Sequence, residues 1–333
     1  MVLQALRLAW RRKRIERARE ATQELKTVLS ELRQLGHRSN AQEFQESPMV
    51  ARLKTDSQFF NLGKMIYNNA DENPEEIQKA LFLWRKAMKM GSVAAKYSVA
   101  VCLKNGVGMK ERDIKAAVKH FQELSERGHK WGMFGYADAL SKGEGTRKDP
   151  KKAFSLFLQA AQGDVPPAFL NVANMYLSGT GVAKNEEEGI KWLLRAAETG
   201  DPQAKATLAD HYFHGKGVPK DVKKAVVLYH QAATRGIATA QYNLGFLFLT
   251  GDGVKQDSLE AEGLFRRAAE QGFVMAMVNL AQMYRTGYGD VPQNVELAKQ
   301  WLELAAPHDE NAKELLEHLN EDTPAAETVK TTE

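Results

Sequence analysis

The sequence predicts an all-α protein built as a solenoid of helical hairpins, and three observations carry this prediction. A Gly-x-Gly turn recurs at a nearly constant period, apolar residues between the turns follow helical spacing, and polar caps mark where helices begin. A fixed period of this length is the signature of a repeat array, because one hairpin alone cannot bury its apolar face. The period is visible in one glycine of each turn, at spacings of 37, 36, 36, 36 and 36 residues: Gly106, Gly143, Gly179, Gly215, Gly251 and Gly287.

The first helix of each repeat is predicted from apolar columns that keep this period. Within the helix the apolar residues fall at i, i+4 and i+8, which is the spacing of one buried face. A small residue lets paired helices approach, a branched residue fills the core, and an aromatic residue precedes the turn. These columns are Ala168, Ala204, Ala240 and Ala276; Val172, Leu208, Leu244 and Leu280; and Tyr176, Tyr212, Phe248 and Tyr284.

The second helix of each repeat is predicted from its two ends. It begins after a residue whose short side-chain oxygen can accept the free N–H groups of the first turn. It ends at a glycine, which is a C-cap signal. The N-caps are Asp113, Asp149, Asn185, Asp221, Asp257 and Asn294, and the glycines are Gly91, Gly128, Gly163, Gly200, Gly236 and Gly272.

The repeats divide the chain into four parts. Six complete units run from about Ser92 to Pro307, and a degenerate unit before them has NPEE in place of the glycine turn, so the array covers residues 58–307. Residues 308–333 are predicted to hold a short terminal helix and an acidic, disordered tail. Residues 36–57 are polar and mixed, which predicts a linker, and residues 1–35 are predicted to form a basic amphipathic helix.

The repeat unit resembles the Sel-one-like repeat (SLR), a relative of the tetratricopeptide repeat with a longer loop inside each repeat. The stretch AQYNLGFLFLTGDGVKQDSLEAEGLFRRAAEQG, from Ala240 to Gly272, shows nearly the whole pattern, and six units agree in register. The resemblance implies a right-handed α/α superhelix of about seven repeats whose first helices line a concave groove. It also implies a scaffold or adaptor that binds a protein or peptide in this groove, with no shared catalytic residues.

Polar residues of the first helices are therefore candidates for contacting an extended peptide in the groove, where asparagine can hydrogen-bond the peptide backbone. The alternative is that these side chains bridge or cap neighbouring repeats within the fold, and the sequence leaves both interpretations open. The candidate residues are Asn171, Asn174, Asp210, Tyr242, Asn243, Asn279 and Gln282.

The sequence offers no residues for an enzyme. The glycine turns do not indicate a phosphate site, since no strand precedes them and no G-x-x-x-x-G-K-[S/T] motif occurs. His211 and His214 have a spacing that could hold zinc, but Asp210 is the one further ligand nearby, so solvated histidines are the expectation. Cys102 is expected to be a buried small residue rather than a nucleophile. Some bacterial relatives interact with β-lactams, but this sequence lacks an S-x-x-K motif on which such an activity could rest. We therefore expect no catalytic residue, cofactor or metal.

Composition and charge exclude other classes. The single cysteine permits no intrachain disulfide, and no apolar run approaches the roughly 20 residues of a membrane helix. The net charge is +4 without a dense basic face, so no nucleic-acid partner is predicted.

The N-terminal segment MVLQALRLAWRRKRIERARE leaves three interpretations open. Its residues 1–20 carry seven Arg or Lys against two Glu, which is typical of a mitochondrial import signal. It is also compatible with a basic helix that docks on an import receptor, another partner or an acidic membrane surface, or with a helical cap of the array. The sequence thus predicts a non-enzymatic scaffold that works in mitochondria as an assembly or complex-organising factor. The alternatives are a cytosolic or membrane-surface signalling or quality-control adaptor and, last, a β-lactam-interacting hydrolase-type repeat protein.

Overall fold

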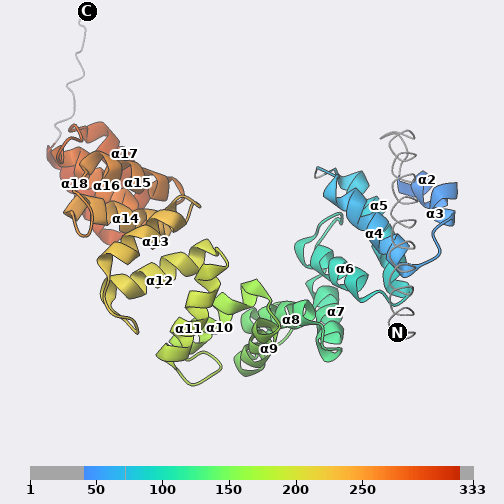
Figure 1. Ribbon diagram of the computed structural model, residues 1–333. Helices are drawn as coiled ribbons and strands as arrows, with labels where there is room; N and C mark the ends of the chain where they lie inside the picture. Colours follow the sequence, from blue (N-terminus) through green and yellow to red (C-terminus); the bar gives the residue numbers. More distant parts are fainter. Residues whose placement is uncertain (1–40, 72, 323–333) are drawn as a thin grey trace, which may run out of the picture. The chain divides into compact units, whose positions relative to one another are not determined.

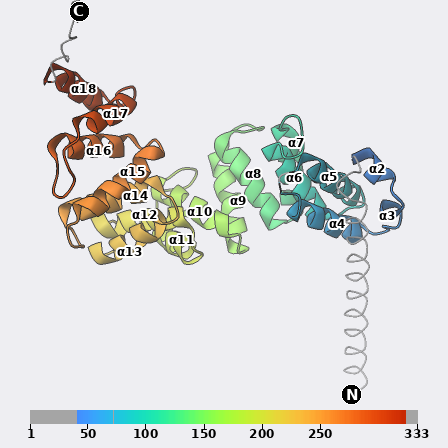
Figure 2. The same ribbon diagram turned by 90° about the horizontal axis from the view of Figure 1, so that it is seen from above.

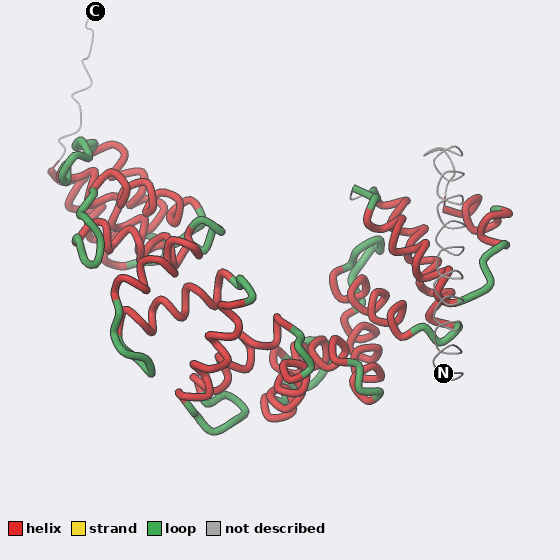
Figure 3. Tube along the Cα trace, viewed as in Figure 1, coloured by secondary structure: helices red, strands yellow, loops and turns green. Residues whose placement is uncertain are grey.

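The computed structural model describes residues 41–71 and 73–322, and all regular secondary structure in this part of the chain is helical (Figure 1, Figure 3). The predicted all-α fold is confirmed. The basic helix predicted for residues 1–35 and the acidic tail after residue 322 lie outside the described residues. The chain divides into two compact units, Met1–Val165 and Pro166–Glu333.

In its described residues the first unit contains three helical hairpins, and within the unit the helices of these hairpins pack against their neighbours in sequence. The tightest packing is within a hairpin, as the period predicts. The hairpins are α4 (Asp56–Asn68) with α5 (Pro74–Lys89), α6 (Val93–Asn105) with α7 (Ile114–Glu126), and α8 (Lys130–Lys142) with α9 (Pro150–Gln162).

As far as residue 322 the second unit contains four hairpins followed by one more helix, and Figure 2 shows the successive hairpins side by side. The same pairing rule applies, so each unit is a stack of repeats in the order of the sequence. The elements are α10 (Pro166–Ser178) with α11 (Glu186–Glu198), α12 (Pro202–His214) with α13 (Val222–Ala233), α14 (Ala238–Thr250) with α15 (Ser258–Glu270), α16 (Val274–Thr286) with α17 (Val295–Ala305), and then α18 (Glu310–Asp322).

The predicted N-caps form as the sequence indicates, while the predicted C-cap glycine Gly163 has a φ of −83° and the next residue, Asp164, takes the left-handed conformation. Each predicted N-cap side chain accepts a backbone N–H of the second helix; for example, Asp221 Oδ1 accepts from Lys224 N at 3.0 Å. The backbone N–H of the same Asp221 donates to Tyr212 O at 2.9 Å, which closes the loop between the two helices of the repeat. Each cap residue therefore satisfies one free N–H of the helix that follows and one free C=O of the helix that precedes, which fixes both ends of the turn.

The second glycine of the turn has a packing role that the spacing alone does not reveal, and Gly253 and Gly108 are examples. Gly253 has a φ of +74°, and a Cβ there would lie 2.6 Å from Val222 Cγ1 on the preceding repeat's second helix. Gly108 is equally tight, since its Cβ would lie 2.6 Å from Ile77 Cγ2. The glycines allow the backbone to turn and to touch the neighbouring repeat, so they act in repeat stacking.

The predicted alanine and branched columns are buried, whereas in the aromatic column Tyr284 is buried and the other three rings are half-buried. The alanines of the first column, Ala168, Ala204, Ala240 and Ala276, are all 0% exposed. Beside them, large residues fill the space between helices; Phe265 and Leu244 are almost completely buried. Small residues thus set the helix separation and large ones fill it, as the column pattern predicts.

The structure differs from the predicted linker at residues 36–57. Residues 41–51 contain two short helices, α2 (Ala41–Glu46) and α3 (Pro48–Ala51), and α2 packs against α5. Phe44 and Val50 are buried, and these two apolar side chains explain why the polar segment does not stay detached. Within residues 41–71 and 73–322, no helix combines the length and apolar character needed to cross a membrane.

Candidate protein-binding face of the second unit

The first helices of the second unit each expose one side, and we call these residues together the helix-A face. On each helix they are separated by four, three and four positions, which places them on the same side. All are exposed or half-buried, none is Lys or Arg, and Asp210 is the one carboxylate among them. The face consists of Pro167, Asn171, Asn174 and Ser178 on α10; Gln203, Thr207, Asp210 and His214 on α12; Thr239, Asn243, Phe246 and Thr250 on α14; and Met275, Asn279, Gln282 and Thr286 on α16.

Two of the predicted groove residues, Asp210 and Asn243, are brought together by the stacking of α12 and α14. Asn243 Nδ2 donates to Asp210 Oδ1 at 2.9 Å. The same carboxylate oxygen accepts the hydroxyl proton of Tyr229, a buried residue of α13. Asn243 Nδ2 also lies 3.3 Å from Tyr229 Oη. The three side chains form a closed bridge between two successive repeats.

A second pair of predicted residues, Tyr242 and Asn279, bridges the next two repeats. Asn279 Nδ2 donates to Tyr242 Oη at 3.4 Å, which is a long hydrogen bond. The Tyr242 ring packs between Phe265 and Phe273, with centroid distances of 5.6 and 5.0 Å. Tyr242 and Asn279 therefore also contribute to the packing of one repeat on the next, which is the structural interpretation that the sequence left open.

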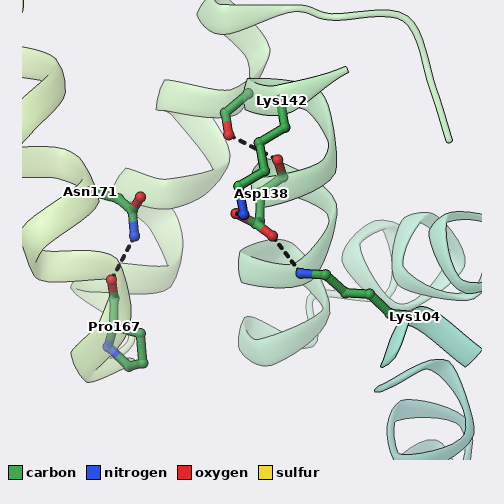
Figure 4. A network of polar contacts seen from close by, with 6 residues as sticks. Lys104, Asp138, Lys142, Pro167 and Asn171 are labelled. Atoms are coloured by element: carbon green, nitrogen blue, oxygen red, sulfur yellow. Dashed lines mark hydrogen bonds and ion pairs between the residues drawn. The ribbon is translucent and has the colours of Figure 1, made fainter. Parts of the chain in front are cut away.

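The remaining predicted residues are not connected to these bridges. Asn171 Nδ2 donates to Pro167 O of its own helix at 2.8 Å (Figure 4). Asn174 and Gln282 are exposed on α10 and α16. These two amides are the predicted residues most accessible to a partner.

A hollow of about 200 Å³ lies on the helix-A face between α12, α13 and α14. Its walls are mainly aromatic, and Phe246 is 43% exposed at its edge. Tyr229 and Asn243, the two partners of Asp210, also line it. The lining residues are Phe213, His214, Tyr229, Tyr242, Asn243, Phe246 and Leu247.

The electrostatics of the Asp210 bridge follow from its partners. Burial raises the pKa of Asp210, and this effect outweighs the opposing contributions of the Tyr229 hydroxyl, the two neighbouring histidines and Asn243. Burial and the adjacent carboxylate raise the pKa of Tyr229 as well. The bridge is therefore held by neutral donors, and the carboxylate is less readily ionised than an ordinary aspartate.

The first unit holds a contrasting aspartate at the same position of its repeat, Asp138 on α8. Lys104 Nζ lies 2.5 Å from Asp138 Oδ2, and Lys142 Nζ lies 2.8 Å from Asp138 Oδ1 (Figure 4). Burial disfavours the charged form of Asp138, but hydrogen bonds and charge from the two lysines outweigh this and lower its pKa.

The two histidines and the cysteine that the sequence analysis weighed as reactive groups have structural contacts or are buried. His211 Nδ1 contacts Lys216 O at 2.7 Å, and His214 Nδ1 contacts Asp210 O at 2.9 Å. Cys102 is buried in α6, and burial raises the pKa of its thiol to about 11, so the reactive thiolate is disfavoured. In the part of the chain that the structure describes, no three His, Cys, Asp or Glu side chains gather as metal ligands would.

Sequence reasoning missed Tyr229, Phe213 and Phe246. A signal was present, because two of these residues depart from their columns. Tyr229 stands where other repeats carry Phe157, Leu193 and Phe265, and Phe246 stands where they carry Asp138, Asn174, Asp210 and Gln282. A hydroxyl in an apolar column and a phenyl ring in a polar column mark this repeat pair as different.

These features define a helical-repeat protein with an exposed, largely uncharged face and without a recognisable reaction centre in the described residues. The model of the Sel1 repeat matches residues 60–92, 93–129, 132–165, 167–201, 202–237, 238–273 and 274–306. The chain belongs to the Sel1 repeat family. Sel1 repeat proteins are in general non-enzymatic scaffolds that bind protein partners.

Two solved structures show the same fold. A Sel1 repeat protein from Oxalobacter formigenes is 30% identical, with a TM-score of 0.65, and the match covers 75% of this chain and 100% of that one. The protein c5321, a protective antigen of uropathogenic Escherichia coli strains with an SLR fold, is 25% identical, also with a TM-score of 0.65, over 86% of this chain and 68% of that one. A comparison with curated proteins returned no match.

Proposed function

We propose that this chain is a non-enzymatic scaffold that binds a segment of a partner protein along the helix-A face of the second unit. The observation that carries the proposal is the combination, on one face, of accessible amides, exposed apolar side chains and the aromatic hollow. Asn174 and Gln282 offer hydrogen bonds, while Phe246 and Met275 are 43% and 52% exposed. A continuous face of this kind, presented by pre-formed helices, binds without paying for its own ordering.

The same observation limits how the partner is held. The amides of Asn171, Asn243 and Asn279 already donate hydrogen bonds within the fold, so they are only partly available to a partner. The main contacts therefore come from Asn174, Gln282, Phe246 and Met275, and charge plays a small part along most of the face.

The test is capture of a partner by the full chain and by a triple variant, Asn174→Glu, Phe246→Glu and Gln282→Glu. Partners are first identified by affinity purification and mass spectrometry. The variant places three negative charges on the face, and a bound partner would bury them. Because an unpaired charge in an interface costs more than about 1.4 kcal/mol, we expect capture to fall at least about tenfold. Helicity and the melting temperature should stay close to those of the parent, because all three residues are exposed.

A matched control carries Gln231→Glu and Gln300→Glu, two exposed positions on the second helices α13 and α17. This control should capture the partner as well as the parent chain does. Equal capture by the face variant and the parent would refute the proposed face.

We further propose that the scaffold works in mitochondria as an assembly or complex-organising factor. The support is the Arg-rich, acid-poor composition of residues 1–20, which is typical of an import signal. A fluorescent protein fused to residues 1–40 should show a mitochondrial pattern. A diffuse or plasma-membrane signal would instead favour a cytosolic or membrane-surface adaptor.

A further inference from the structure

The aromatic hollow between α12, α13 and α14 has the chemistry of a site for a cation. Four rings line it, from Phe213, Tyr229, Tyr242 and Phe246. The face of an aromatic ring carries negative electrostatic potential and attracts ammonium and guanidinium groups. One of these rings already does so within the chain, since Lys220 Nζ lies 5.6 Å from the centroid of Phe213.

A carboxylate contacts two of the residues that line the hollow. Asp210 Oδ1 accepts hydrogen bonds from Tyr229 and Asn243, and both donors line the hollow. Across residues 41–71 and 73–322, no Lys or Arg forms an ion pair with Asp210. A half-buried carboxylate with two neutral partners gains from a nearby cation, whereas an apolar occupant would remove more water from it without compensation.

The equivalent aspartate of the first unit shows what is missing. Asp138 is paired with Lys104 and Lys142. Around Asp210 the corresponding residues are Leu177, on the preceding repeat, in place of Lys104, and His214 in place of Lys142. His214 uses its Nδ1 on the backbone oxygen of Asp210. The chain thus places two lysine ammonium groups at Asp138 and none at the equivalent positions around Asp210.

We propose that the hollow receives a basic side chain, Arg or Lys, of a partner protein segment, with the alkyl stem against Phe213 and Phe246 and the cation facing the Tyr229–Asp210–Asn243 bridge. This inference rests on the proposed function, because it names the side chain that the helix-A face selects. The proposal requires that the side chain bound in the hollow carries a positive charge. Equal binding of an apolar side chain would contradict it.

The experiment uses the full chain and two capped tripeptides, acetyl-Gly-Arg-Gly-amide and its uncharged counterpart acetyl-Gly-norleucine-Gly-amide. Binding is followed through the side-chain amide signal of Asn243 in a chain labelled with ¹⁵N-asparagine. The arginine peptide should shift this signal saturably, and the norleucine peptide should bind at least about tenfold more weakly, as expected for the loss of a cation–π contact and a facing carboxylate.

Four variants locate the effect. Asp210→Asn keeps the shape and the acceptor oxygen but removes the charge, and should weaken the arginine peptide about tenfold. Phe246→Ala, at an exposed position, should weaken it without a change in melting temperature. Asp138→Asn, the matched substitution in the first unit, should leave it unchanged. His214→Lys should also weaken the peptide, because it supplies a cation from the chain itself at the position of Lys142.

The inference is overturned if both peptides bind equally, if Asp210→Asn retains full binding of the arginine peptide, or if neither peptide shifts Asn243. Its failure differs from a failure of the proposed function. Capture of a partner that is lost in the triple face variant, together with no peptide binding, would leave the scaffold proposal standing and reject the cation site. Peptide binding without any face-dependent capture would do the reverse.

Discussion

Asp138 in the first unit and Asp210 in the second occupy the same position of their repeats, yet their surroundings differ in kind. Asp138 is held by two lysines, and its pKa is lowered. Asp210 is held by a tyrosine hydroxyl and an asparagine amide, and its pKa is raised. Both side chains join successive first helices, so the repeat keeps a bridge at this position while its chemistry changes.

The difference arises from a few substitutions in one register. Phe157 in the repeat of Asp138 becomes Tyr229 in the repeat of Asp210, which adds a buried hydroxyl that requires an acceptor. Lys142 becomes His214, which removes the ammonium group one turn further along the helix. The ionic bridge is complete within the chain, whereas the neutral bridge leaves a carboxylate beside an aromatic hollow. A repeat array can thus change the chemistry of one position without altering its fold.

The largest expected difference concerns removal of each aspartate. Asp210→Ala deprives the buried Tyr229 hydroxyl of its acceptor, and we expect a loss of about 2 kcal/mol in the free energy of unfolding. Asp138→Ala leaves two lysines whose side chains are 31% and 53% exposed and can turn to water, so we expect about 1 kcal/mol or less. Urea unfolding of both variants measures the two losses in the free energy of unfolding. Because both variants replace Asp by Ala at the same helix position, the change in helix propensity is the same in each.

The control for this comparison is Tyr229→Phe, which restores the phenyl ring found at position 157. Combined with Asp210→Ala, it should recover part of the lost stability, because no buried hydroxyl then remains without an acceptor. Equal losses in Asp210→Ala and Asp138→Ala would show that the two bridges are energetically alike.

A smaller effect is expected in the pH dependence of Asp210→Asn and Asp138→Asn. The folded-state pKa of Asp138 lies below its ordinary value of 3.8, so its contribution is present above that pH and is lost as the pH falls through the folded pKa. The pKa of Asp210 is raised above 3.8, so its contribution is present below that pH and is lost as the pH rises through the folded pKa.

The stability that Asp138→Asn costs should therefore grow as the pH rises from about 2 to about 6, while the cost of Asp210→Asn should shrink. Urea midpoints of the parent and both variants at several pH values give the two slopes. Slopes of the same sign would contradict the assignment of an ionic bridge to one unit and a neutral bridge to the other.

Most of the fold followed from the sequence. The glycine period, the Asp and Asn caps and the alanine columns predicted the hairpins of the array, because these signals act within a few residues of each other. Residues 36–57 were predicted to be a linker, but the structure has two short helices there. Phe44 and Val50 are buried in this segment, and no local sequence pattern indicates their burial. Burial of this kind depends on a surface formed elsewhere in the chain.

The candidate face was predicted as a set of columns, but the role of each member was not. Sequence alone determined which residues share a side of the first helices, since helical spacing fixes that. Only the tertiary structure decided that Asp210 meets Tyr229 and Asn243 and that four rings surround a hollow beside them, because these side chains come from three helices in two repeats. Hydrogen bonds and burial depend on distances across the stack, and those distances are set by how the repeats pack.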